Sequence, residues 1–135
     1  MGGRRTRRPP TILAELKPSF FATAVELRDW LERNHATATE LVVGFYKKDS
    51  AKASITWPEL VDEALCFGWI DSVRKGIDEV SYSNRLTPRT QRSTWSAINI
   101  ARAKELIALG RMRPAGLKAF ERRTADRSAI YSYEQ

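Results

Sequence analysis

The hydrophobic pattern of the chain is clearest over residues 56–71. Apolar side chains recur there at intervals of three and four, which places them on one side of a helix: Trp57, Leu60, Val61, Ala64 and Leu65. Thr56 is a favourable N-cap residue, and Glu59 stands three positions later, at the spacing of a capping box. Gly68 follows, and a glycine in the left-handed conformation ends many helices. The pattern therefore predicts a one-sided helix that begins after Thr56, ends at Gly68 and leads directly into a strand.

Three segments have the β-branched and aromatic content of strands, namely residues 40–47, 69–74 and 80–86. The last two are separated by a turn near residues 75–78, so we expect them to pair in an antiparallel manner. Gly44 interrupts the first of the three, which predicts a bulge or the close approach of another backbone. Residues 19–21 are expected to form a short strand or an extended segment.

Helices are also predicted over residues 24–34, from residue 95 or 96 to 109, and from 115 to about 123. These elements and the length of 135 residues predict an α+β fold, with a small antiparallel sheet and packed helices in a single compact domain. We place this domain at residues 19–123. Residues 1–18 are expected to form a disordered basic N-terminal arm, and residues 124–135 a frayed C-terminal tail.

The net charge of +7 is unevenly distributed along the chain. Residues 1–10 carry four arginines and no acidic residue. Residues 11–84 carry 8 basic and 12 acidic side chains, a net charge of −4, whereas residues 85–123 carry 10 basic and 2 acidic ones, a net charge of +8. A basic excess confined to one contiguous third of the chain favours an anionic partner.

Composition argues against several classes of protein. No stretch approaches the roughly 18–20 apolar residues that cross a membrane, and no apolar segment follows the basic N-terminus as in a secretory signal. Cys66 is the single cysteine, which excludes an internal disulfide and suits a reducing compartment, so we expect a cytoplasmic protein. His35 is the single histidine, and the ligands of a structural zinc site are absent, so no metal or cofactor is predicted.

A dense run of anion-binding groups begins the basic third. On a period of 3.6 residues, Trp95, Ile98, Asn99, Arg102, Leu106 and Leu109 share one face of the predicted helix. Arginine is preferred where a planar fork recognises phosphate, and the helix N-terminus adds free N–H groups. The candidate ligand-binding residues are Arg85, Arg89, Ser93, Trp95, Ser96, Asn99 and Arg102. Trp95 is expected to stack on a base if the ligand is a nucleic acid.

The same arginines have a structural alternative. Either Arg85 or Arg102 could form an internal ion pair that fixes the helix to the sheet. The acidic partners would be Glu63 and Asp71, which could instead act as general acid and base if their pKa values were separated. The sequence leaves these alternatives open. Cys66 lies near the buried stripe of its helix, which favours a core thiol over a nucleophile.

Three motifs resemble a known family. They are ALCFGWIDS at residues 64–72, TPRTQRSTWSAINIAR at 87–102, and the later pattern of Leu106, Gly110, Met112 and Pro114-Ala115-Gly116. In this order they resemble the bacteriocin-protection family, also labelled YdeI or OmpD-associated, over roughly residues 20–123. The resemblance implies a compact bacterial α+β domain with a role in resistance to antimicrobial peptides or an association with an outer-membrane porin. It assigns no catalytic residues, and the lack of an export signal favours a cytoplasmic stress or resistance role.

We therefore expect a non-enzymatic, cytoplasmic binding domain that engages a phosphate-bearing ligand or nucleic acid through residues 85–102. One alternative is a small enzyme that uses Glu63 or Asp71 as acid or base. Another is an interaction module that binds an acidic protein partner.

Overall fold

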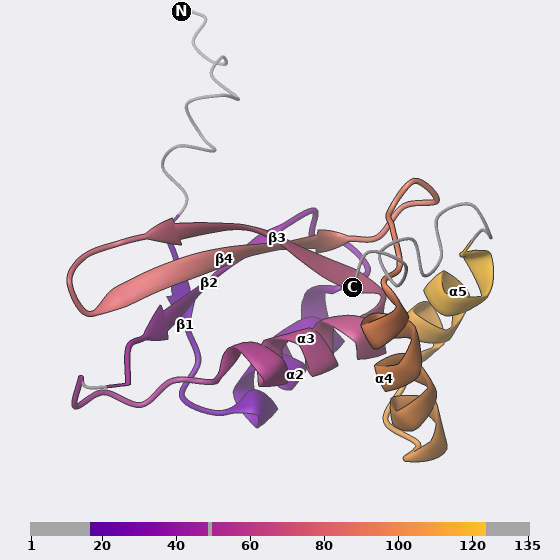
Figure 1. Cartoon of the computed structure of the whole chain (residues 1–135), viewed down its shortest axis with the longest axis horizontal. Helices are drawn as coiled ribbons and strands as arrows, with labels where there is room; N and C mark the ends of the chain where they lie inside the picture. The colour runs from indigo at the N-terminus through magenta and orange to yellow at the C-terminus, as the bar shows by residue number, and fades with distance from the viewer. Residues whose placement is uncertain (1–16, 49, 124–135) are drawn as a thin grey trace, which may run out of the picture.

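A computed structural model describes residues 17–48 and 50–123, which form a four-stranded sheet and four helices (Figure 1). In chain order the elements are β1 (Ser19–Phe20), α2 (Ala24–Asn34), β2 (Leu41–Tyr46), α3 (Trp57–Phe67), β3 (Trp69–Gly76), β4 (Ser81–Pro88), α4 (Ala97–Ala108) and α5 (Pro114–Arg122). The strand order is β1-β2-β4-β3; β1 runs parallel to β2, and the other neighbours are antiparallel. Figure 1 shows α2 and α3 along one face of the sheet, with α4 and α5 beyond one end.

The predicted α+β class and the compact single domain are confirmed for the described residues. The three predicted strands pair in an antiparallel manner, and the short β1 adds a parallel edge that makes the sheet mixed. The predicted N-terminal arm, apart from residues 17 and 18, and the predicted C-terminal tail lie outside the described residues.

The local signals around α3 produce the expected helix ends. Thr56 Oγ1 accepts a hydrogen bond from the backbone N–H of Glu59, and the Glu59 carboxylate accepts one from the N–H of Thr56, so the capping box is formed. Gly68 ends the helix with φ of 75° and ψ of 30°. Trp57 departs from the predicted buried stripe, since its side chain is 45% exposed. It is the first residue of α3, and its indole N–H turns to the carboxylate of Asp71.

Gly44 has a different role from the one its position in β2 predicts. β2 pairs with β4 in continuous register from Leu41 to Tyr46, so the predicted bulge is wrong. The close neighbour is a side-chain ring and not a backbone, because a Cβ on Gly44 would lie 2.5 Å from Cζ of Phe20. Glycine thus makes room for the ring of Phe20, which also stacks on Tyr46 at a centroid distance of 4.4 Å.

Helix α4 buries a narrower face than its sequence predicts. Ala103 and Leu106 are fully buried, but Ile98 and Leu109 are 76% and 64% exposed. The helix lies beyond the end of the sheet and packs against α3, so only a narrow stripe meets another element (Figure 1).

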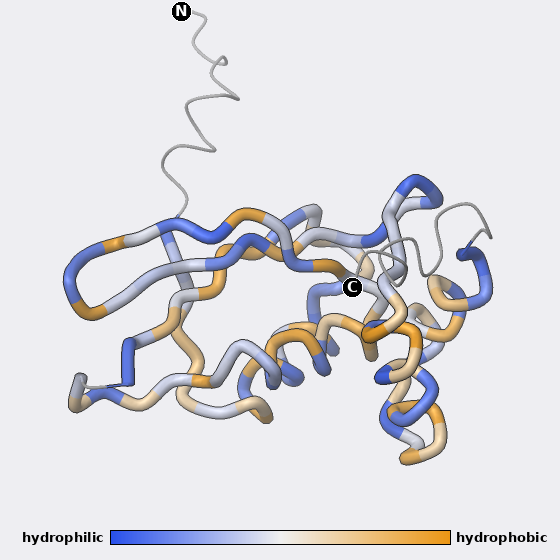
Figure 2. Tube along the Cα trace, in the orientation of Figure 1, coloured by the Kyte–Doolittle hydropathy of each residue, from blue (hydrophilic) through white to orange (hydrophobic). Residues whose placement is uncertain are grey.

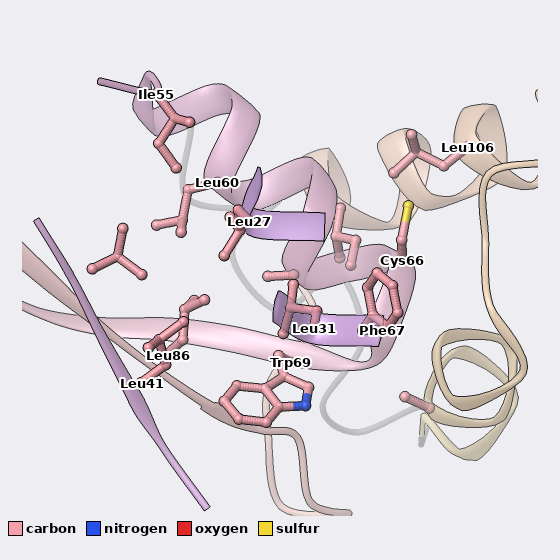
Figure 3. Packing of buried hydrophobic residues seen from close by; sticks show 14 of the residues in the cluster. Leu27, Leu31, Leu41, Ile55, Leu60, Cys66, Phe67, Trp69, Leu86 and Leu106 are labelled. Atoms are coloured by element: carbon pink, nitrogen blue, oxygen red, sulfur yellow. The ribbon is translucent and has the colours of Figure 1, made fainter. Parts of the chain in front are cut away.

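The main core lies between the sheet and the two helices that cover it. Figure 3 shows Leu27 and Leu31 of α2 beside Leu60 of α3, with Leu86 of β4 on the sheet side, and all four are fully buried. Cys66 points from α3 towards the α4 side of the core (Figure 3). Figure 2 shows that the loop between β4 and α4, which carries several candidate ligand residues, is strongly hydrophilic.

Candidate functional site

Four arginines of the basic third form ion pairs with acidic residues from the first half of the chain. The pairs are Arg85 with Glu40, Arg102 with Asp62, Arg111 with Glu63 and Arg113 with Glu32. The acidic excess of residues 11–84 therefore offsets part of the basic excess of residues 85–123 in the folded domain. Because these arginines are paired within the molecule, the uneven charge distribution along the sequence is weaker evidence for an anionic partner than it is in the sequence alone.

Arg102 is held by two carboxylates. It donates from Nε and Nη2 to the two oxygens of Asp62 at 2.8 and 2.7 Å, and from Nη1 to Glu105 at 2.7 Å. The hydrogen bonds to Asp62 and Glu105 raise the pKa of Arg102. The internal-pair alternative is thus confirmed for Arg102, but Glu63 is not its partner. Successive helical residues are turned by about 100°, so Asp62 faces α4 while Glu63 faces α2.

Arg85 is also paired inside the molecule, but on the outer face of the sheet. Successive strand residues point to opposite faces, and the neighbouring Leu86 is fully buried. Asp71 is the register partner of Leu86, so it lies on the side away from Arg85. Arg85 instead donates from Nε to Oε1 of Glu40. The predicted pairing of Arg85 with Asp71 is therefore wrong.

Trp95 is buried and cannot stack on a base in this conformation. Its side chain is 2% exposed, and it packs edge-on against Phe120 at a centroid distance of 5.5 Å. Ser96 serves as the N-cap of α4, where its side chain accepts the N–H of Asn99. Ser93 accepts the backbone N–H of Thr90 through its hydroxyl. These hydroxyls shape the loop and the start of the helix, and base stacking by Trp95 is a wrong prediction.

Glu63 is a buried anchor between two helices and a loop. It is 2% exposed, and its two oxygens accept hydrogen bonds from Arg28 at 2.7 Å and from Arg111 at 2.6 Å. Arg28 also donates to the carbonyl of Arg111 at 2.6 Å. A carboxylate held by two guanidinium groups in this way joins α3 to α2 and to the segment before α5.

Asp71 orients other side chains on the core face of the sheet. Its Oδ2 accepts hydrogen bonds from Nε1 of Trp57 at 3.2 Å and from Nδ2 of Asn84 at 3.4 Å. Asn84 is buried, and its Oδ1 has no hydrogen-bond partner among the described residues. Neither Asp71 nor Glu63 lines the pocket described next, and acid or base chemistry by these two residues stays a prediction.

Arg89 differs from the other candidate arginines because it is buried and forms no ion pair with a carboxylate in the described part of the chain. It is 6% exposed, and its guanidinium donates from Nε to the carbonyl of Trp69 at 3.3 Å and from Nη1 to that of Thr94 at 2.9 Å. One face of the guanidinium covers the Trp95 ring, 3.9 Å from its centroid. Burial lowers the pKa of Arg89 to about 10, although the charge of Asp71 acts in the opposite direction. Arg89 is still a cation at neutral pH.

The buried guanidinium borders a pocket of about 270 Å³ at the C-terminal end of α3. The described residues that line it are His35, Ala36, Phe67, Gly68, Trp69, Pro88, Arg89, Ala115, Lys118 and Arg122. They come from the end of α2, the junction of α3 and β3, the end of β4, and α5. The junction fixes Arg89 by its backbone as well, because Arg89 N–H donates to the carbonyl of Gly68 at 2.8 Å.

The charged groups around this pocket are all basic among the described residues. Lys118 and Arg122 are exposed and lie one turn apart on α5, and Arg122 Nη2 approaches the carbonyl of Arg89 at 3.4 Å. His35 donates from Nδ1 to the carbonyl of Leu31 at 2.7 Å, which leaves Nε2 for other contacts. This arrangement can attract an anion and offer it hydrogen-bond donors from Arg89 and α5.

The structure thus brings one predicted ligand residue, Arg89, to the pocket, while the other six candidates do not line it. Sequence reasoning missed Lys118, Arg122 and His35. A signal existed for the first two, since basic residues four apart on a helix share one face. No local signal places His35 beside them, because the end of α2 meets α5 only in the folded chain.

The described part of the chain contains neither a clustered metal site nor a membrane-spanning helix. No group of three or more His, Cys, Asp or Glu side chains there is placed to hold a metal ion. Within the same ranges, no helix has the length and apolar character needed to cross a membrane.

Comparisons with known proteins place the chain in one family. No curated protein and no solved structure matches it. The family model that matches is described as a domain of unknown function, DUF8412, and it covers residues 19–119. This description does not mention bacteriocin protection, so that resemblance stays an expectation. Because the match spans the described fold from β1 into α5, the chain belongs to the family of the domain of unknown function DUF8412.

Proposed function

We propose that this protein is a binding domain, and that the pocket around Arg89 binds the phosphate group of a small ligand. The observation that supports this most directly is a buried guanidinium at the wall of a pocket, with no carboxylate partner among the described residues. A buried charge is costly unless it is paired or well hydrogen-bonded, and two carbonyl oxygens supply only partial charges. A phosphate bound beside Arg89 supplies the missing negative charge.

The other arginines of the basic third provide an internal comparison. Arg102 and Arg111 each donate to a carboxylate at 2.7 Å or less. Arg89 is more deeply buried than either of them, yet within residues 17–48 and 50–123 no carboxylate pairs with it. An arginine that served only to hold the fold together would be stabilised by the same kind of ion pair. That Arg89 departs from this pattern favours a ligand as the partner of its charge.

The size and lining of the pocket suit a phosphate on a small organic group. Its volume of about 270 Å³ lies just below the range of about 300–1,000 Å³ that is common for small-molecule sites. Phe67, Trp69 and Pro88 supply apolar wall, while Arg89, Lys118 and Arg122 supply donors. Arginine forks match the geometry of phosphate oxygens, and Lys118 adds a point charge.

The motifs that resemble the bacteriocin-protection family converge on this pocket. The first motif contributes Phe67, Gly68 and Trp69, the second Pro88 and Arg89, and the third Ala115. This convergence supports the proposal that the pocket carries the role of the domain. A cytoplasmic stress or resistance role is the part of the proposal that rests on the resemblance alone.

The test is binding of inorganic phosphate, pyrophosphate and ribose 5-phosphate, measured by calorimetry and by the shift in Tm, with chloride at equal ionic strength as reference. Arg89→Gln removes the buried charge and is expected to weaken binding at least about tenfold, since hydrogen bonds to charged groups contribute about 1.5–3 kcal/mol. Lys118→Gln with Arg122→Gln changes only exposed side chains and is expected to weaken binding several-fold without loss of folding.

Lys104→Gln is the matched control, because Lys104 is an exposed lysine on α4 outside the pocket. It is expected to leave phosphate binding unchanged. Absence of binding to all three phosphates would overturn the proposal, as would binding that the Lys118 and Arg122 changes leave intact.

A further inference from the structure

A second pocket lies at the opposite end of α3, beside the residues that lead into the helix. Its volume is about 530 Å³, within the range of small-molecule and peptide sites. It opens between the end of β2, the tyrosine Tyr82 on β4, and residues 52–58 before and at the start of α3. Figure 1 shows this region at the end of the molecule away from α4 and α5. We call it the lysine groove, after the three lysines that line it: Lys47, Lys48 and Lys52.

The lysine groove is positively charged, and its lysines have no ion-pair partner in the described part of the chain. All three lysines are exposed, and none forms an ion pair within 4.0 Å among the described residues. No described residue that lines the groove is acidic. Asp78 lies on the β3–β4 turn near Lys47. The positive charge of Lys47 is one of the causes that lower the pKa of Asp78. Three like charges that converge on one groove favour an anionic occupant.

Two tyrosines of the groove each contact another aromatic ring and a cationic side chain. Tyr46 has the Phe20 ring at 4.4 Å and the ammonium of Lys52 at 5.3 Å from its centroid. Tyr82 has the Phe45 ring at 5.0 Å and the guanidinium of Arg74 at 4.4 Å. Both tyrosine rings are thus already in contact with other side chains.

Trp57 is the aromatic residue of the groove that offers a free ring face. Its side chain is 45% exposed, and no other described ring stacks on it. The hydrogen bond from Nε1 of Trp57 to Asp71 at 3.2 Å holds one edge of the indole and so fixes the orientation of the ring. A large apolar ring held in place beside three lysines is the arrangement that binds an unpaired base next to its phosphates.

We infer that the lysine groove binds single-stranded nucleic acid, with one base on the face of Trp57 and adjacent phosphates on Lys47, Lys48 and Lys52. A duplex is disfavoured, because its bases are already stacked and cannot reach an indole in a groove. The inference is independent of the phosphate pocket, since the two sites lie at opposite ends of α3 and share no lining residue.

The experiment measures fluorescence anisotropy of labelled ten-nucleotide dT and rU strands with the full-length protein at 50 and 200 mM salt. The four arginines of residues 1–10 are replaced with glutamine in every sample, so that a nonspecific basic arm does not contribute. In this background Lys47→Gln, Lys48→Gln and Lys52→Gln together are expected to weaken binding at least tenfold. They should also reduce the slope of log K against log salt by about two, since each phosphate contact on a single strand contributes about 0.7.

Trp57→Ala is expected to weaken binding about tenfold with little change in the salt slope, because stacking carries no counterion release. Its matched control is Ile98→Ala, which removes an exposed apolar side chain from α4. Lys75→Gln with Lys104→Gln controls for the loss of exposed lysines that line neither pocket, and should leave strand binding unchanged.

The inference is overturned if no strand binds once the arm is neutralised, or if the triple lysine variant binds as the parent does. Equal affinity for a ten-base-pair duplex, or binding that is indifferent to Trp57→Ala, would overturn the stacking mode. Failure of the phosphate pocket would appear separately, either as absence of phosphate binding by the wild-type protein or as phosphate binding that Arg89→Gln does not weaken.

Discussion

Arg28 Nη1 lies 2.7 Å from Oε1 of Glu63, a carboxylate whose side chain is only 3% exposed. Its second oxygen is paired with Arg111 at 2.6 Å. Removing one partner of a buried ion pair leaves the remaining charge uncompensated, at a cost of about 3–5 kcal/mol. We therefore predict that Glu63→Gln lowers the free energy of unfolding by about 3 kcal/mol, measured by urea denaturation.

Glu32→Gln is the matched control, because Glu32 pairs with Arg113 while both side chains are more than a third exposed. Exposed pairs contribute about 0–1 kcal/mol, so this change should have a small effect. A Glu63→Gln protein of wild-type stability would contradict the anchoring role and would return the carboxylate to consideration as a catalytic group.

Helix α5 docks on the end of α3 by a backbone contact at Gly116. A Cβ at this position would lie 2.2 Å from the carbonyl oxygen of Cys66 and 2.7 Å from that of Leu65. Glycine to alanine in a helix normally stabilises by up to about 1 kcal/mol. Here the clash should reverse the sign, and we predict that Gly116→Ala destabilises the protein by about 1–3 kcal/mol in urea denaturation.

The control for this change is Gly76→Ala, since no atom lies within 4 Å of a Cβ built on Gly76. It should alter the free energy of unfolding by less than about 0.5 kcal/mol. If the two substitutions changed the free energy of unfolding equally, α5 would be able to shift away from α3 at little cost, which would contradict the prediction. Because Gly68 and Ala115 at this junction also line the phosphate pocket, Gly116→Ala should weaken phosphate binding as well.

The elements that the sequence predicts well are those with local causes. The capping box of Thr56 and Glu59 and the left-handed Gly68 depend on residues at most four positions apart, and both ends of α3 follow. Gly44 shows the limit of such reasoning. The glycine correctly indicates close approach, but the neighbour is Phe20, which is distant in sequence and reaches β2 only through the parallel pairing of β1.

The candidate site was less predictable because ion pairing is decided by tertiary contacts. Arg102 and Asp62 are 40 positions apart, and Arg85 and Glu40 are 45 apart. In the sequence alone Arg85 and Arg102 therefore suggest a ligand site, because their acidic partners Glu40 and Asp62 are far away along the chain. Arg89 belongs to the same run in the sequence, and it is separated from the others only by its burial with no carboxylate paired to it among the residues that the structure describes.

The β3–β4 turn should add stability that depends on pH. Asp78 Oδ1 accepts hydrogen bonds from the hydroxyl of Ser81 at 2.7 Å and from the N–H of Val80 at 2.9 Å. These bonds lower the pKa of Asp78 below its ordinary value of 3.8. A carboxylate with a lowered folded-state pKa stabilises the fold above its unfolded-state pKa, and this contribution is lost as pH falls through the folded-state pKa.

We therefore predict that Asp78→Asn lowers Tm above pH 4, and that the difference from the wild type shrinks as the pH falls towards 2. The measurement is a series of thermal melts between pH 2 and pH 6 on both proteins. A difference that grows towards acid pH, or one that is constant across the series, would show that the charge of Asp78 does not stabilise the turn.

Cys66 should be an unreactive thiol in the folded protein. It is fully buried on α3, and burial raises the pKa of its thiol, while Arg28 acts in the opposite direction. The thiolate is the reactive form, so a buried thiol with a raised pKa reacts only when the structure opens. We predict that iodoacetamide at pH 8 labels the native protein at least about tenfold more slowly than the urea-unfolded protein, measured by mass spectrometry. In Gly116→Ala, whose clash falls on the carbonyl of Cys66, labelling should accelerate. Rapid labelling of the native wild type would instead mark Cys66 as accessible and restore the nucleophile hypothesis.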